Sequence, residues 1–85
     1  MTDQEVINLV NQTLCEEFEL DPAALRPEAT LYEDLELDSL DAVDMVVALE
    51  QAFKVKIRDE ERIRKIRTLG EIHTFVLEKY RAQKA

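Results

Sequence analysis

The chain has 85 residues, which suffices for one domain with a small hydrophobic core, and we expect a single domain over residues 1–85. Apolar residues make up 46% of it and charged residues 35%, which excludes a disordered tail. One glycine, two prolines and no tryptophan argue against a β-sandwich and a glycine-rich nucleotide site. We therefore expect an all-α fold.

Cysteine content and hydropathy bear on the compartment. The single Cys15 excludes an internal disulfide and a thiolate metal cluster, and it favours a reducing environment. No apolar run approaches the roughly 20 residues of a membrane span, and the first residues lack a basic segment followed by an apolar stretch. The sequence predicts a cytoplasmic protein without membrane insertion.

The net charge of −8 is unevenly distributed. Residues 1–53 hold fourteen acidic and one basic side chain, a net of −13, whereas residues 54–85 hold ten basic and five acidic side chains, a net of +5. An acidic surface of this size repels nucleic acid and anionic lipid and attracts basic protein surfaces. We expect protein partners with basic docking patches and no nucleic acid partner.

The first predicted helix covers residues 3–18. Thr2 and Glu5 have the spacing of a capping box, in which each side chain accepts a hydrogen bond from the backbone of the other. Apolar residues then recur at three- and four-residue steps on one face, namely Val6, Ile7, Val10, Leu14 and Phe18.

Residues 19–38 form a long predicted connection. Pro22 and Pro27 forbid an uninterrupted helix in this stretch. A connection of this length in a small domain is usually functional or packed by its own side chains. Five leucines can supply that packing: Leu20, Leu25, Leu31, Leu35 and Leu37.

A second helix is predicted over residues 39–53, with Asp38 as its N-cap and Asp41 in its first turn. Met45, Leu49 and Phe53 lie on one four-residue row and are expected in the core. Its apolar positions form a band wider than a surface helix needs, and part of it should face a partner or a ligand. The band consists of Leu40, Ala42, Val43, Met45, Val46, Val47, Ala48, Leu49 and Phe53.

The last third of the chain predicts a short helix and a long one. The short helix begins at Asp59-Glu60-Glu61, with Ile63 and Ile66 as its apolar anchors. Thr68 and Glu71 repeat the capping-box spacing and start the last helix. Its apolar stripe comprises Leu69, Ile72, Val76 and Tyr80, and the cations Lys79, Arg81 and Lys84 suit its C-terminal end.

No set of residues in the sequence forms a recognisable catalytic site. His73 is the single histidine, predicted to be an exposed or half-buried helical residue, and Cys15 has no basic residue near it in sequence. A calcium loop starting at Asp34 would need Gly and Glu where Ser39 and Met45 stand. We predict no catalytic residue and no metal site, with weak divalent binding by clustered carboxylates as a minor hypothesis.

Ser39 remains as a candidate for modification. It lies in the first helical turn after a long connection, where a modifying enzyme can reach its hydroxyl. The helix dipole favours an attached phosphate there by about 0.3–1 kcal/mol. Asp38 and Asp41 would repel that phosphate, so we interpret these carboxylates as recognition features for a basic enzyme.

Two stretches around Ser39 resemble the acyl carrier protein family: Ala29-Thr30-Leu31-Tyr32-Glu33-Asp34-Leu35 followed by Leu37-Asp38-Ser39-Leu40-Asp41, and Val46-Val47-Ala48-Leu49-Glu50. The likeness covers nearly the whole chain. It implies an acyl-carrier-like four-helix bundle with three main helices, a short third helix and a long loop between helices 1 and 2.

The resemblance also implies the function. Ser39 would bear 4′-phosphopantetheine, derived from coenzyme A, whose thiol holds acyl groups as thioesters for fatty-acid or related acyl or polyketide biosynthesis. The resemblance also implies a monomer. Such a carrier is not an enzyme, because its partners, a phosphopantetheinyl transferase, acyl synthases and acyltransferases, supply the catalytic groups. The partner-binding residues implied on and beside the second helix are Asp38, Leu40, Asp41, Val43, Asp44, Val47 and Glu50.

The chain departs from the common family pattern in two places. Glu36-Leu37 replaces Gly-Ala before Asp-Ser-Leu, which is expected to add a charge and a large apolar group beside the arm. The third helix is basic where the family is commonly acidic, and it is one residue longer. Its cations either form a solvated face or restrict partner choice, as in a specialised carrier. The alternative function is a degenerate carrier-like interaction module without a prosthetic group.

Overall fold

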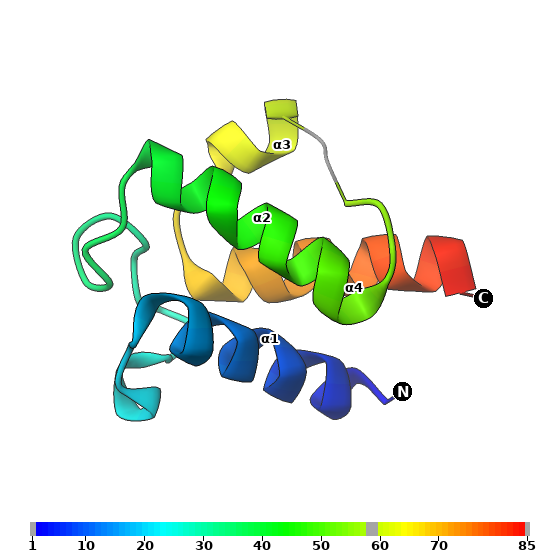
Figure 1. Ribbon diagram of the computed structural model, residues 1–85, viewed down its shortest axis with the longest axis horizontal. Helices are drawn as coiled ribbons and strands as arrows, with labels where there is room; N and C mark the ends of the chain where they lie inside the picture. The colour runs from blue at the N-terminus through cyan, green and yellow to red at the C-terminus, as the bar shows by residue number, and fades with distance from the viewer. Residues whose placement is uncertain (1, 58–59, 85) are drawn as a thin grey trace.

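The computed structural model describes residues 2–57 and 60–84, which form three long helices and a short one (Figure 1). The helices are α1 (Asp3–Phe18), α2 (Ser39–Phe53), α3 (Glu60–Lys65) and α4 (Leu69–Lys84), and a 3-10 turn, η1 (Pro22–Ala24), lies between α1 and α2. The predicted all-α fold is confirmed, and the predicted bounds of α1 and α2 agree with the structure.

Side-chain caps define where the helices begin. In α1, the Glu5 amide donates to Thr2 Oγ1 at 3.2 Å and the Thr2 amide donates to the Glu5 carboxylate at 2.9 Å. These bonds lower the pKa of Glu5, with the Thr2 backbone bond as the largest cause. In α4, the Glu71 amide donates to Thr68 Oγ1 at 3.3 Å, but the Glu71 carboxylate accepts from the Thr68 hydroxyl. The predicted starts of α1 and α4 are thus confirmed, with a modified capping box in α4. The predicted start of the short helix at Asp59 lies outside the described residues.

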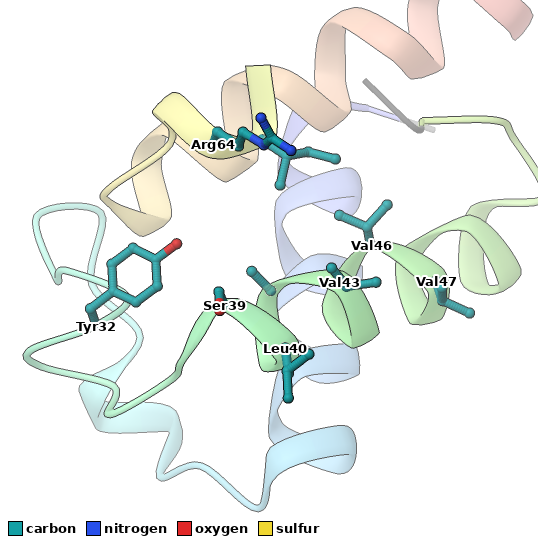
Figure 2. A pocket seen from close by; sticks show the side chains of 9 residues that line it. Tyr32, Ser39, Leu40, Val43, Val46, Val47 and Arg64 are labelled. Atoms are coloured by element: carbon teal, nitrogen blue, oxygen red, sulfur yellow. The ribbon is translucent and has the colours of Figure 1, made fainter. Parts of the chain in front are cut away.

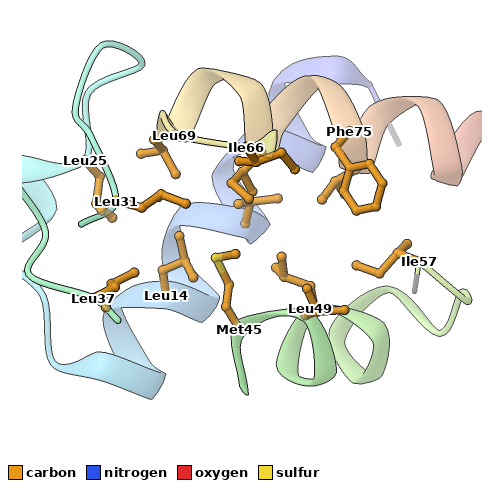
Figure 3. Packing of buried hydrophobic residues seen from close by; sticks show 14 of the residues in the cluster. Leu14, Leu25, Leu31, Leu37, Met45, Leu49, Ile57, Ile66, Leu69 and Phe75 are labelled. Carbon is orange, nitrogen blue, oxygen red and sulfur yellow. The ribbon is translucent and has the colours of Figure 1, made fainter. Parts of the chain in front are cut away.

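The hydrophobic core lies where α1, α2 and α4 face one another (Figure 3). The predicted core row of α2 is buried, and α4 adds Phe75, which the predicted stripe omits. Phe75 is 1% exposed because α4 is covered on more than one side and buries a band instead of a single stripe. The fully buried side chains include Val6, Val10, Leu14, Met45, Leu49, Ile57, Leu69, Ile72, Phe75 and Val76.

Backbone hydrogen bonds fix the long connection between α1 and α2 to the start of α4. The Leu31 amide donates to the Arg67 carbonyl at 2.8 Å, and the Leu69 amide donates to the Ala29 carbonyl at 2.9 Å. Gly70 lies so close that a Cβ built on it would stand 3.0 Å from the Pro27 carbonyl oxygen. Four of the five predicted leucines are buried and Leu20 is half-buried, so the connection is packed as predicted.

The prediction for His73 was wrong. Its side chain is buried, with 6% exposed, and its Nε2–H donates to Asn11 Oδ1 at 2.8 Å, joining α4 to α1. His73 follows the buried Ile72 on the face that packs against α1, so the helix contact encloses the imidazole. Burial lowers the pKa of His73 below its ordinary value of 6.5.

Candidate functional site

Ser39 is the first residue of α2, and its side chain is exposed. The preceding N-cap holds the chain in place: the Asp41 amide donates to the Asp38 carboxylate at 2.8 Å, and the Asp38 amide donates to the Asp41 carboxylate at 3.1 Å. Both carboxylates therefore point at backbone amides on either side of Ser39. The serine hydroxyl stands on a well-defined helix start, with negative charge close to it.

The residues just before Ser39 make a tight, hydrogen-bonded turn. Glu36 has a φ of 56°, a left-handed conformation that costs a side-chain-bearing residue about 1 kcal/mol and suits glycine. Leu37 then donates its amide to the Leu31 carbonyl at 2.9 Å and buries its side chain in the core. The expectation that Leu37 adds an apolar group beside the arm was wrong, because this turn directs Leu37 inward and leaves Glu36 exposed.

A cavity of about 460 Å³ lies next to Ser39, between α2 and α3 (Figure 2). Its size is in the range of small-molecule sites, and most of its walls are apolar. The residues lining it are Tyr32, Ser39, Leu40, Ala42, Val43, Val46, Val47, Ile63 and Arg64. The exposed Ser39 hydroxyl thus borders a largely apolar space.

The predicted partner-binding residues on and beside α2 differ in how far their side chains are exposed to solvent. Leu40 is 74% exposed and Val43 is 58% exposed, which makes them the most exposed large apolar side chains among the described residues. Asp38 and Asp44 are exposed, and Asp41, Val47 and Glu50 are half-buried. The structure therefore brings together an exposed apolar patch and carboxylates near Ser39, whereas Glu50 lies farther along the helix.

Five residues that border the cavity were missed as site residues: Tyr32, Ala42, Val46, Ile63 and Arg64. Tyr32 lies in the stretch that resembles the family, and Ala42 and Val46 lie in the wide apolar band of α2, so these three had a signal in the sequence. Ile63 and Arg64 reach the site because α3 lies beside α2 (Figure 1).

The cations of the basic segment differ in their contacts. Arg62 is bonded to Glu78 and its guanidinium lies 4.9 Å from the centre of the Phe75 ring, a cation–π contact. Arg64, Lys65 and Arg67 are exposed, and Arg58 lies outside the described residues. Arg62 therefore links α3 to α4, and partner selection by the basic segment stays a prediction.

The described part of the chain contains no group of three or more metal-ligating side chains placed to hold an ion. Over the same residues, no helix is long and apolar enough to cross a membrane. Acidic residues before Ser39 instead accept hydrogen bonds from the backbone. Asp34, for example, accepts the Thr30 amide at 2.8 Å and so stabilises the turn.

The described part of the chain is thus a small helical bundle in which an exposed serine at a helix start borders an apolar cavity. The family model described as a phosphopantetheine attachment site matches residues 8–76. Acyl carrier protein 2 of Ralstonia nicotianae is 39% identical over 72 residues, covering 85% of this chain and 88% of the relative. The acyl carrier protein of Thermosynechococcus vestitus is 37% identical over 82 residues, covering 96% and 100%.

The fold comparison agrees with the sequence comparisons. A solved structure of the acyl carrier protein from Enterococcus faecalis matches with a TM-score of 0.73 and 24% identity, over 93% of this chain and 99% of that one. This chain belongs to the acyl carrier protein family. It carries acyl intermediates on a 4′-phosphopantetheine arm, is not an enzyme, and interacts with a phosphopantetheinyl transferase and acyl-processing enzymes.

Proposed function

We propose that Ser39 is the residue that bears the arm, within a single carrier domain formed by residues 1–85. The observation that supports this most directly is the exposed Ser39 hydroxyl at the start of α2, bordering the α2–α3 cavity. In the loading step, Ser39 Oγ bonds to the pantetheine phosphorus of coenzyme A, and the bond to the adenine nucleotide breaks. The serine proton goes to a base of the transferase, and the adenosine bisphosphate leaves.

The apolar walls of the cavity support a second part of the proposal, in which the acyl chain lies between α2 and α3. Val43, Val46 and Ile63 offer aliphatic surface that an acyl chain would cover at a gain of about 25 cal/mol per Å². The terminal thiol of the arm holds the acyl group as a thioester. Sheltering the chain would keep its apolar surface out of water between reactions.

Intact mass spectrometry tests the proposed carrier function. The full chain is incubated with coenzyme A and a phosphopantetheinyl transferase, and we expect a gain of one phosphopantetheine group. A digest of the product should place the added group on the peptide that contains Ser39. An unchanged mass, with a transferase active on another carrier in the same tube, would favour a degenerate interaction module without a prosthetic group.

Partner enzymes are proposed to dock on the face of α2 that holds Leu40, Val43 and Asp44. An apolar centre flanked by carboxylates suits a basic enzyme surface with an apolar contact, since charge steers association and apolar burial adds affinity. The Asp44→Lys variant should slow association with the transferase at low salt by several-fold, about 1 kcal/mol, and the loss should shrink as salt rises.

The matched control for that test is Glu28→Lys, the same charge reversal at an exposed position in the connection. Equal association rates for wild type and both variants at low salt would contradict docking on this face. Lys65→Glu, assayed with an acyl-processing enzyme that presents carboxylates, tests whether the exposed cations of α3 select a specialised partner, since this variant should lose affinity for an acidic surface. We further propose a monomer in the cytoplasm, consistent with the single half-buried Cys15.

A further inference from the structure

The α2–α3 cavity has one charged residue among the described residues that line it, Arg64. Ser39 and Arg64 border the same space from two helices, and Tyr32 borders it from the long connection (Figure 2). The remaining lining residues are apolar. A cation and a phenol hydroxyl on the wall of an apolar cavity beside the attachment serine have no role in sheltering an acyl chain.

Arg64 also differs from its neighbour Arg62. The Arg62 side chain forms an ion pair with Glu78 and a cation–π contact with the Phe75 ring. The Arg64 side chain is exposed and makes no hydrogen bond or ion pair within the part of the chain that the structure describes. Its five N–H donors are therefore available to a ligand, and a guanidinium is especially suited to phosphate oxygens.

The charge around Ser39 creates a need for such a cation. The Asp38 and Asp41 carboxylates are held beside Ser39 by their bonds to backbone amides. A phosphodiester on Ser39 adds another negative charge in this region. Like charges repel, so a cation close to Ser39 would favour a position of the phosphodiester near the protein surface.

We propose that Arg64, together with the Tyr32 hydroxyl, binds the phosphodiester of this chain's own arm and so directs the arm along the α2–α3 cavity. The proposal rests on the proposed attachment at Ser39. Arg64 and Tyr32 are then positioning residues, which act on where the arm lies and not on any reaction of its thioester. Because Arg64 is exposed, its hold on the arm weakens as salt is added.

The test is an NMR comparison of apo and holo forms of the full ¹⁵N-labelled chain, with loading verified by intact mass. On loading, we expect the Arg64 Nε–Hε resonance and the Ile63 amide resonance to shift. In Arg64→Gln, the loading-induced shift of Ile63 should fall by about twofold or more, and the ³¹P resonance of the arm should lose its salt dependence. Arg64→Lys, which keeps the charge, should restore part of both effects.

The matched control is Lys65→Gln, the same charge change on the same helix at an exposed residue that does not line this cavity. It should retain the wild-type shifts, and circular dichroism should show every variant folded. Equal loading-induced shifts in wild type and Arg64→Gln, or no shift on α3 when wild type is loaded, would overturn the proposal while leaving attachment at Ser39 intact. A wild-type chain that gains no mass would refute the attachment proposal itself.

Discussion

The α4 side of the molecule and the first turns of α2 use the same kinds of apolar side chain with opposite results. On α4, Ile72, Phe75 and Val76 are at most 1% exposed, whereas Leu40 and Val43 on α2 are 74% and 58% exposed. Burial of a large apolar side chain contributes about 1.5–3 kcal/mol to the free energy of unfolding. The buried side chains of α4 make this contribution, whereas the exposed Leu40 and Val43 of α2 do not. The contrast indicates that α4 contributes mainly to the core, whereas α2 packs its inner row into the core and presents the outer side of its first turns at the site.

The largest effect is expected from the core side. Phe75→Ala should lower the free energy of unfolding by about 3–5 kcal/mol, since it leaves a cavity and removes the ring under Arg62. Val43→Ala on the exposed side should change it by no more than about 0.5 kcal/mol. Denaturant unfolding of both variants measures the difference, and similar losses would contradict the division between the two sides.

A smaller effect is expected where the long connection meets α4. Gly70→Ala places a Cβ at 3.0 Å from the Pro27 carbonyl oxygen, a backbone atom that moves only if the connection shifts. We expect a loss of about 1–2 kcal/mol, even though alanine is the better helix former. Thermal unfolding checks this, and a variant more stable than wild type would show that the connection is not held against α4 as described.

The buried His73 makes the free energy of unfolding depend on pH. Because burial lowers its folded-state pKa below the ordinary 6.5, its stabilising contribution is complete above pH 6.5 and is lost as pH falls through the folded-state value. Wild type should therefore lose more stability than His73→Gln between about pH 7.5 and about pH 5.5. Unfolding midpoints at both pH values measure this, with carboxylate effects common to both chains. Parallel losses would exclude a role for His73.

Helix boundaries could be predicted because their signals are local. The Thr2–Glu5 and Asp38–Asp41 pairs cap their helices within three residues of sequence, and the structure shows these bonds. The position of Ser39 at a helix start followed from the same local pattern. The core row of α2 could be predicted because a single apolar face follows from helical spacing.

What could not be predicted depends on how helices pack. His73 and Phe75 are buried because of where α1 and α3 lie against α4, and their spacing within α4 does not reveal this. Arg62 and Arg64 stand two residues apart in one basic run, yet Arg62 forms an ion pair with Glu78 of α4 and Arg64 lines the cavity. Leu37 points inward because Glu36 adopts a left-handed conformation, which its residue type does not favour.

The proposed carrier function depends most on the Ser39 hydroxyl, and the intact mass of Ser39→Ala tests this dependence directly. Wild type and variant are incubated side by side with coenzyme A and a phosphopantetheinyl transferase, after circular dichroism has shown both folded. Removing an exposed hydroxyl in a first helical turn should change stability by no more than about 0.5 kcal/mol. We predict a gain of one phosphopantetheine group for wild type and none for Ser39→Ala. A loaded Ser39→Ala would contradict the account.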